Sequence, residues 1–263
     1  VVLLTAALVT YLATPVVRLG AVRMRMMAAP RERDVHVIPT PRGGGVAMYL
    51  GVAAAVLVAT RLPALQRTFE EPQTIAVLVA GGLISALGVL DDRWGLDALT
   101  KLTGQIAAAG VMVLLGVQLS YVFLPVADIG TLTFGPSIGV PLTILFTVLI
   151  VNALNFIDGL DGLAAGVSAI AALAFFAYSY NLGLVGYEDV ASAPALVTAV
   201  LAGACLGFLP HNFSPARIFM GDSGSMLVGL MLSAAAVTAI GRVDPQSFDS
   251  AASLLPLALP LLV

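Results

Sequence analysis

The sequence predicts an all-α, polytopic integral membrane protein, a helical bundle with eight membrane spans followed by the start of a ninth. Three observations support this fold class. Hydrophobic residues make up 59% of the chain and charged residues only 10%, whereas about 25% of an average soluble domain is charged. The apolar residues gather into segments of roughly the 20 residues that a helix needs to cross a bilayer. The lysines and arginines, finally, are divided unequally between alternate loops.

The apolar segments follow one another along the chain with short polar connections. Between the fourth and fifth segments, glycines and prolines surround two short β-like runs at 121–124 and 131–134, which predict a small hairpin outside the membrane. The chain begins without a methionine and ends inside an apolar run, so we expect missing residues on both sides. The segments lie at about 1–20, 44–62, 73–90, 99–118, 138–154, 163–181, 193–209, 223–241 and, incompletely, 250–263.

The positions of arginine and lysine indicate which loops face the cytoplasm, because cytoplasmic loops carry an excess of these residues. When the loops are assigned alternately to the two sides, nine positive residues fall on one side and three on the other. The side with nine is therefore predicted to be cytoplasmic. It holds Arg18, Arg23, Arg25, Arg31, Arg33, Arg42, Arg93, Lys101 and Arg217. The other side holds Arg61, Arg67 and Arg242.

Acidic residues collect at the same cytoplasmic ends of the predicted spans. An ionised side chain at the bilayer centre costs roughly 2.5–3.5 kcal/mol on insertion scales, so such residues need compensation. Because acids from several spans meet at one face, we interpret them as one site built by several helices. They are Glu32, Asp34, Asp91, Asp92, Asp97, Asp158, Asp161 and Asp222.

The adjacent carboxylates of Asp91 and Asp92 end the third apolar segment. They repel each other unless a cation neutralises them, which suits metal binding or a general base. The alternative is a solvated pair at a helix end, beside Arg93. Lys101, the only lysine in the chain, begins the fourth segment. It is either a cation that contacts phosphate or a helix-end lysine whose stem lies along apolar surface.

Four polar residues recur every three positions around the fifth segment: Asn152, Asn155, Asp158 and Asp161. In a straight helix their directions drift by about half a turn, so they share one site only if the helix breaks. Gly159 and Gly162 are the places where it could break. The alternative is a short cytoplasmic turn in which the aspartates cap helices.

The last polar element precedes the eighth segment and contains Asp222 and Ser223 between glycines. Small residues let a ligand approach the backbone, and helix N-termini favour anions; the alternative is that one of these residues is an N-cap. Many aspartates with two histidines and one cysteine favour Mg²⁺ (or Mn²⁺) over zinc. Mg²⁺ with phosphate indicates phosphoryl chemistry at the membrane face.

Taken in order, these motifs resemble the polyprenyl-phosphate N-acetylhexosamine-1-phosphate transferases, the family that includes WecA, TagO and MraY. The resemblance is closest to the actinobacterial WecA-like enzymes, which load GlcNAc-1-phosphate onto decaprenyl phosphate. Two departures are Gly43, where the family has Leu or Met, and a His-rich loop between spans 9 and 10 that the chain ends before. The matching stretches are 33–36, 39–45, 87–92, 99–105, 152–166 and 206–229.

The resemblance implies an enzyme that transfers GlcNAc-1-phosphate from UDP-GlcNAc to decaprenyl or undecaprenyl phosphate, releases UMP and begins cell-wall or surface polysaccharide synthesis. It implies Mg²⁺, a UDP-sugar and a polyprenyl phosphate lipid, allows a homodimer and involves no nucleic acid. Residues 1–263 would be one transmembrane catalytic domain of a multi-pass plasma-membrane protein, with its active site on the cytoplasmic side and its C-terminal spans and His-rich loop missing.

The resemblance also assigns roles to individual residues. The implied metal ligands are Asp222 and Asp91. The implied catalytic residues are Asp91, Asp92, Asp158 and Asp161, with Asp91 or Asp92 taking the proton of the attacking phosphate. The implied substrate-binding residues are Lys101 for phosphate, Asn152 and Asn155 for the nucleotide sugar, Asn212 and Phe219 for the diphosphate and uracil, and His36 and Arg42 in the loop before the second span.

Three alternatives differ in substrate or class. An MraY-like enzyme would use UDP-MurNAc-pentapeptide as the sugar donor. A CDP-alcohol phosphotransferase also carries Asp-x-x-Asp-Gly, but its pattern needs an arginine where this chain has Gly166. An acid-lined cation transporter would spread its acids through the depth of the membrane, whereas here they gather at one face.

Overall fold

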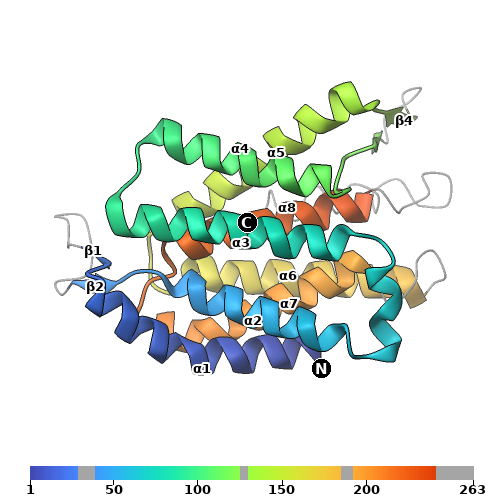
Figure 1. The fold of residues 1–263 in the computed structure, drawn as a ribbon. Helices are drawn as coiled ribbons and strands as arrows, with labels where there is room; N and C mark the ends of the chain where they lie inside the picture. Colours follow the sequence, from blue (N-terminus) through green and yellow to red (C-terminus); the bar gives the residue numbers. More distant parts are fainter. Residues whose placement is uncertain (29–38, 125–129, 185–191, 241–263) are drawn as a thin grey trace.

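Eight long α-helices form a bundle in the computed structural model, which describes residues 1–28, 39–124, 130–184 and 192–240. The helices lie side by side with their long axes roughly aligned (Figure 1). A 3₁₀ helix, η1 (Pro63–Phe69), follows the second of them. The helices are α1 (Val2–Arg23), α2 (Gly44–Ala59), α3 (Gln73–Trp94), α4 (Ala98–Leu114), α5 (Pro136–Ile157), α6 (Leu163–Leu184), α7 (Ala193–Asn212) and α8 (Gly221–Ile240).

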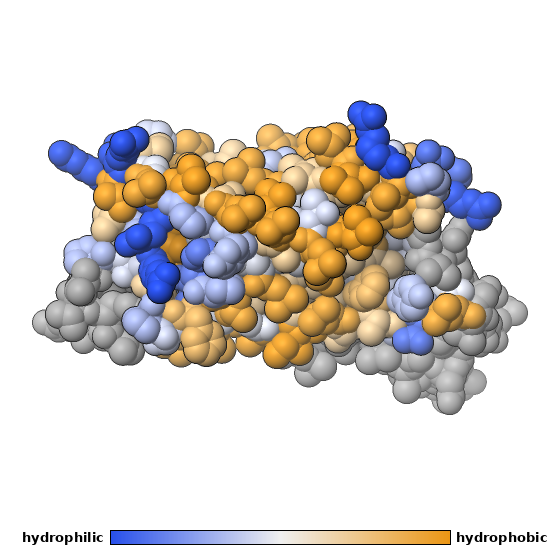
Figure 2. Space-filling view, turned by 90° about the horizontal axis from the view of Figure 1, so that it is seen from below, coloured by the Kyte–Doolittle hydropathy of each residue, from blue (hydrophilic) through white to orange (hydrophobic). Residues whose placement is uncertain are grey.

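The length and apolarity of the helices are those of a multi-pass membrane protein. Six of the described helices, α1, α3, α5, α6, α7 and α8, are long and apolar enough to cross a bilayer. Helix α2 joins η1 through a bend of 110°, and α4 is shorter, with 17 residues. Figure 2 shows apolar side chains over the middle of one face and strongly hydrophilic ones toward its two ends. The described chain is therefore mostly helical and embedded in the membrane.

The eight helices coincide with the eight predicted spans. The prediction of an all-α membrane bundle is confirmed. Six of the eight predicted spans have the length and apolarity of a crossing helix, and the count of eight stays a prediction. The start of the ninth span at 250–263 lies outside the described residues, and so do Arg31, Glu32, Arg33, Asp34, His36 and Arg242.

Two short antiparallel ladders are added to this helical frame. Strands β1 (Met27–Ala28) and β2 (Thr40–Pro41) pair between α1 and α2. Strands β3 (Tyr121–Leu124) and β4 (Gly130–Thr133) pair between α4 and α5. The hairpin predicted between the fourth and fifth spans is thereby confirmed, with its second strand one residue earlier. Outside the helices, backbone N–H and C=O groups need other partners, and these ladders supply them.

Helix α8 occupies the centre of the bundle. Its whole apolar window is buried, against 83% for α7 and 17% for α1. It packs against α2, α3, α5, α6 and α7. Its sequence is rich in Gly, Ala and Ser, and such small residues let helices approach closely in a membrane where apolar burial gives little drive. Groups at the start of α8 are therefore surrounded by several other helices.

Two glycines bring neighbouring helices into contact with the backbone at the start of α8. A Cβ added at Gly45 of α2 would lie 2.1 Å from the backbone nitrogen of Gly224. One added at Gly88 of α3 would lie 2.3 Å from the backbone nitrogen of Ser223. The first turn of α8 is thus clamped between α2 and α3.

Replacing Gly88 by alanine should lower the thermal stability of the protein in detergent. The new methyl group would overlap the α8 backbone, and overpacking of about 1–3 kcal/mol exceeds the roughly 1 kcal/mol that alanine gains over glycine in a helix. Gly110→Ala is the matched control, because an added Cβ on that α4 residue meets nothing within 4 Å. Equal melting temperatures for Gly88→Ala and Gly110→Ala would contradict the close contact.

Candidate active site

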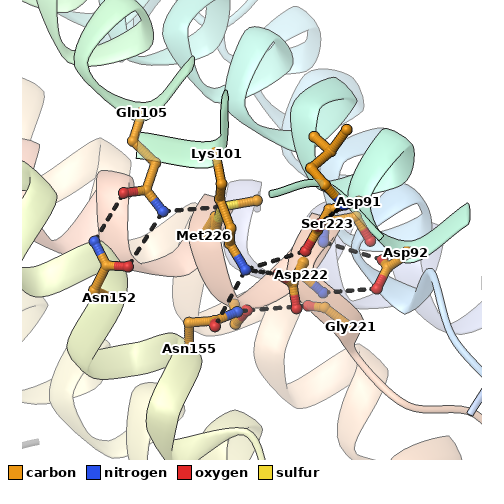
Figure 3. Close-up of polar contacts among 12 residues, drawn as sticks. Asp91, Asp92, Lys101, Gln105, Asn152, Asn155, Gly221, Asp222, Ser223 and Met226 are labelled. Carbon is orange, nitrogen blue, oxygen red and sulfur yellow. Dashed lines mark hydrogen bonds and ion pairs between the residues drawn. The ribbon is translucent and has the colours of Figure 1, made fainter. Parts of the chain in front are cut away.

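One end of the bundle brings together polar side chains from four helices (Figure 3). Asp91 comes from the last turn of α3 and Lys101 from the first turn of α4. Asn155 lies near the end of α5, and Asp222 lies in the first turn of α8. Asp91 and Asp222 confirm the prediction that acids from separate spans share one site.

Lys101 lies at the centre of this cluster. Its Nζ is 3.1 Å from Asp91 Oδ2 and 3.5 Å from Asn155 Oδ1, and it also forms an ion pair with Asp222 Oδ2. The side chains of Asp91, Lys101 and Asp222 are only 14–19% exposed. Charges in such a poorly hydrated place interact more strongly than they do in water. The ammonium group therefore points into the protein between two carboxylates, which excludes the alternative of a helix-end lysine directed to the membrane surface.

The turn between α3 and α4 sets the position of Lys101. Helix α3 ends at Trp94, and the next residue, Gly95, is its C-cap. Gly95 has a φ of 67°, a left-handed conformation that glycine adopts without strain. Asp91 Oδ1 accepts a hydrogen bond from the Leu96 N–H at 2.7 Å, which closes the turn. Asp97 is the N-cap of α4 and accepts two backbone hydrogen bonds of 3.0 Å. Lys101 then follows in the first turn, facing Asp91.

Asp92 points away from Lys101 and caps helix α8. Its Oδ1 accepts from the Asp222 N–H at 3.0 Å, and its Oδ2 accepts from the Ser223 N–H at 3.2 Å. Met220, which precedes α8, has no side-chain oxygen for these N–H groups, so α3 supplies the cap instead. A Cβ at Gly221 would lie 2.5 Å from Asp92 Oδ2, so only glycine admits the carboxylate here. Asp92 thereby fixes the turn that carries Asp222, and its catalytic role stays a prediction.

Asp158 and Arg42 lie beside this cluster. Burial and the charges of Asp92 and Asp222 raise the pKa of Asp158 to about 7, although a hydrogen bond with the Gly221 backbone and the charge of Arg42 act in the opposite direction. The carboxyl of Asp158 is therefore poorly hydrated and lies close to two other acidic groups.

The predicted break after α5 is confirmed. Helix α5 ends at Ile157 and α6 begins at Leu163, with Gly162 at a φ of 71° in the turn between them. The break keeps Asp158 beside Asp222 while Asp161 turns toward another loop. The segment thus combines both interpretations of its sequence, a short interhelical turn that also contributes to the site.

Asp161 and Asn212 hold two loops together. Asp161 Oδ2 accepts from the Ala216 N–H at 3.0 Å. Asn212, which is buried, accepts from the Gly162 N–H at 3.1 Å and donates to the Ile218 carbonyl at 3.0 Å. These bonds join the α5–α6 turn to the α7–α8 loop. The hydrogen bonds that the structure shows hold the two loops in place. The catalytic role of Asp161 and the substrate role of Asn212 stay predictions.

The α7–α8 loop also pairs with the segment before α2. The Phe219 N–H donates to the Pro41 carbonyl at 2.8 Å, and the Phe219 carbonyl accepts from the Gly44 N–H at 3.0 Å. This pairing brings Phe219 and Arg42 to the same end of the bundle as Lys101. Their assignment to substrate remains a prediction.

Three residues around the site carry no role in the sequence interpretation: Gln105, Ser225 and Met226. Ser225 Oγ accepts from Asn155 Nδ2 at 2.9 Å. Asn152 lies one turn deeper than Asn155 and pairs with Gln105 instead of contacting Lys101. A buried glutamine one helical turn after Lys101 in an apolar helix is the signal in the sequence that points to this pair.

The donors of the site fit Mg²⁺ or Mn²⁺ in a particular way. Among the residues that the structure describes, no three His, Cys, Asp or Glu side chains form a ready-made metal site. Mg²⁺ usually takes only one or two carboxylates and fills its other positions with water and substrate phosphates. Asp91 and Asp222 supply two carboxylates, and the amide oxygen of Asn155 lies beside them. Lys101 Nζ contacts these same oxygens, so the set fits a hard cation, held also by substrate, once the ammonium has moved off them.

Comparison with known proteins places the chain among transferases. The family model for glycosyl transferase family 4 matches residues 74–240. The chain is 54% identical over 251 residues to the decaprenyl-phosphate N-acetylglucosaminephosphotransferase of Mycolicibacterium smegmatis, covering 94% of this chain and 61% of that protein. The protein of the same name from Mycobacterium tuberculosis is 53% identical, with 94% and 62% covered.

A more distant relative has a different name. The phospho-N-acetylmuramoyl-pentapeptide-transferase of Mycobacterium sp. strain KMS is 36% identical over 238 residues, covering 76% of this chain and 63% of that protein. The chain thus spans about three fifths of the length of these relatives.

Asp92→Ala should lower the melting temperature of the protein in detergent, because two N–H groups of α8 lose their acceptors. Loss of a helix cap costs about 0.5–2 kcal/mol. Asp92→Asn keeps one acceptor oxygen, so we expect an intermediate melting temperature. Glu70→Gln, at an exposed carboxyl group, is the control and should melt like the wild type. If Asp92→Ala melted no lower than this control, the cap would carry no stability.

Proposed function

We propose that this chain, which belongs to glycosyl transferase family 4, is the catalytic part of a membrane enzyme that transfers GlcNAc-1-phosphate from UDP-GlcNAc to a polyprenyl phosphate and releases UMP. The observation that carries the proposal is the ammonium of Lys101 between the carboxylates of Asp91 and Asp222, at one end of an apolar bundle. A cation and metal-ligand carboxylates at this place suit a reaction between a water-soluble diphosphate and a lipid phosphate.

The choice of sugar rests on the relatives. Over the aligned residues, the chain is 53–54% identical to proteins named as N-acetylglucosaminephosphotransferases and 36% identical to one named for phospho-N-acetylmuramoyl-pentapeptide. We therefore favour UDP-GlcNAc as donor and decaprenyl phosphate, the lipid in the names of the nearer relatives, as acceptor. The product would begin a cell-wall or surface polysaccharide.

We propose Mg²⁺ as the cofactor, with Mn²⁺ as a substitute, held by Asp91 and Asp222 with the amide oxygen of Asn155. When bound, the ion would neutralise phosphate charge. The charge balance supports this proposal. Four carboxyl groups, those of Asp91, Asp92, Asp158 and Asp222, lie around the cations of Lys101 and Arg42, so negative charge would be in excess when all four are ionised. A divalent cation supplies the missing charge.

The protein's own residues then have mainly to position two anions. A phosphate monoester has a second pKa of about 6, so the lipid phosphate is largely dianionic at neutral pH and needs little help from a base. It attacks the β-phosphorus of the UDP-sugar, and UMP leaves with the bonding electrons. Lys101 would contact the phosphate oxygens and reduce the repulsion between the reactants. Catalysis of this kind depends on positioning and electrostatics.

The orientation in the membrane follows from the arginines. Arg18, Arg23 and Arg217 lie at the same end of the bundle as Lys101, and Arg61 and Arg67 lie beyond the other end of α2. We propose that the Lys101 end faces the cytoplasm, where nucleotide sugars are made. We also propose that all eight helices cross the plasma membrane, whereas a homodimer remains only an expectation.

Membranes that contain this protein should release UMP from UDP-GlcNAc when polyprenyl phosphate is added. Release should stop with EDTA and return with Mg²⁺. UDP-MurNAc-pentapeptide should give little or no UMP. Asp222→Asn should abolish release, because it removes a carboxylate that faces both Lys101 and the proposed metal.

The control for this assay is Asp97→Asn, which removes an exposed charge on the same face and keeps a side-chain oxygen that can still cap α4. It should keep most of the activity. UMP release that survives EDTA, or an active Asp222→Asn enzyme, would contradict the proposed site. Preference for UDP-MurNAc-pentapeptide would support the alternative donor.

A further inference from the structure

Two polar layers connect the same three helices at the site. The upper layer consists of Lys101 on α4, Asn155 on α5 and Asp222 on α8. The lower layer lies one helical turn deeper on each of these helices and consists of Gln105, Asn152 and Met226. Figure 3 shows both layers, with Gln105 and Asn152 to the left of Lys101.

The lower layer is a reciprocal amide pair with a sulfur neighbour. Asn152 Nδ2 donates to Gln105 Oε1 at 2.8 Å, and Gln105 Nε2 donates to Asn152 Oδ1 at 3.4 Å. Gln105 Nε2 also lies 3.4 Å from Met226 Sδ. Gln105 is only 1% exposed and Met226 is fully buried. The side-chain amide of Gln105 therefore forms its hydrogen bonds with residues of α5 and α8.

This pairing is sensitive to the register of the helices. A residue on an α-helix moves by 1.5 Å along the axis and by about 100° around it when the helix shifts by one position. Such a shift of α5 would separate Asn152 from Gln105 and leave the buried Gln105 Oε1 without its donor, whereas Asn152 Nδ2 would keep its bond to the Val148 carbonyl on its own helix. A buried polar group without a hydrogen-bond partner costs more free energy than a formed hydrogen bond contributes to stability.

We propose that Gln105 and Asn152 are positioning residues that lock α4 against α5 in the register at which Lys101 meets Asn155 and Asp222. The pair carries no charge and lies below the reacting groups, so it acts through Lys101 and Asn155. This assignment differs from the expectation that Asn152 binds the nucleotide sugar. Its consequence for catalysis rests on the proposed function, whereas the lock itself does not.

Lys101 gives a direct measure of the lock, because it is the only lysine in the chain. Acetylation by an N-hydroxysuccinimide ester, followed by mass spectrometry of the peptide that contains Lys101, reports how free its amine is. The measurement needs no turnover, so it tests the lock even if the proposed function fails. In the wild type, ion pairs with Asp91 and Asp222 should keep acetylation slow.

Gln105→Met and Asn152→Leu, each close in size to the original side chain, should speed Lys101 acetylation by about 3- to 20-fold, the range expected for losing an interhelical hydrogen bond in a membrane protein. The exchanged pair, Gln105→Asn with Asn152→Gln, can restore the amide contact and should stay within about 2-fold of wild type. Thr103→Leu, on the exposed side of α4, is the matched control and should not change the rate.

Each outcome decides the proposal. Faster acetylation in both single variants and recovery in the exchanged pair would support the register lock. Unchanged acetylation in folded Gln105→Met would overturn it, and so would an exchanged pair as reactive as Asn152→Leu. In the UMP assay, the lock predicts similar losses in kcat for the two single variants, with recovery in the exchange. A loss confined to the Asn152 variants, with a raised KM for UDP-GlcNAc, would instead assign Asn152 to substrate.

Discussion

The charge balance around Lys101 is the constraint on which the site depends. An apolar bundle cannot hold isolated ionised groups at low cost, so each carboxylate near its end has to find a cation, a backbone N–H or a metal. Asp91 and Asp222 share the ammonium of Lys101, and Asp92 uses the free N–H groups of α8. The remaining negative charge is what a divalent cation and its phosphate ligands would complete.

The central helix gives this arrangement its rigidity. Helix α8 is buried along its length and begins where α2 and α3 touch its backbone through Gly45 and Gly88. Asp92 then fixes its first turn from outside. Because Asp222 lies in that turn, contacts between helices place its carboxylate, together with the pairing of Phe219 and Met220 before α8. One turn deeper, the Gln105–Asn152 pair sets the position of α4 and α5. Rigid elements with a supporting layer are what a site for two repelling anions requires.

Much of this could be predicted from the sequence, because apolar length and the side of each arginine are properties of the chain alone. They place the helices and the collection of aspartates at one face, and the glycines and prolines around two β-like runs place the hairpin. These properties could not show that Asp91 and Asp92 have different partners. Neighbours on a helix point about 100° apart, and the partners of Asp92 lie more than a hundred positions away in the sequence. The same limit applies to Asn152 and Asn155, which are alike in the sequence but belong to different layers. Gln105 could be identified only as a buried polar residue, because its partner lies on another helix.

The most direct test of the site is the binding of Mn²⁺, measured by electron paramagnetic resonance on the purified protein with UDP-GlcNAc present. If Asp91 and Asp222 hold a divalent cation beside Lys101, the wild type should bind one Mn²⁺ per chain. Asp222→Asn should weaken that binding by more than about tenfold, and Asp97→Asn should leave it unchanged. Equal Mn²⁺ affinity in the wild type and Asp222→Asn would show that the cluster around Lys101 is not the metal site.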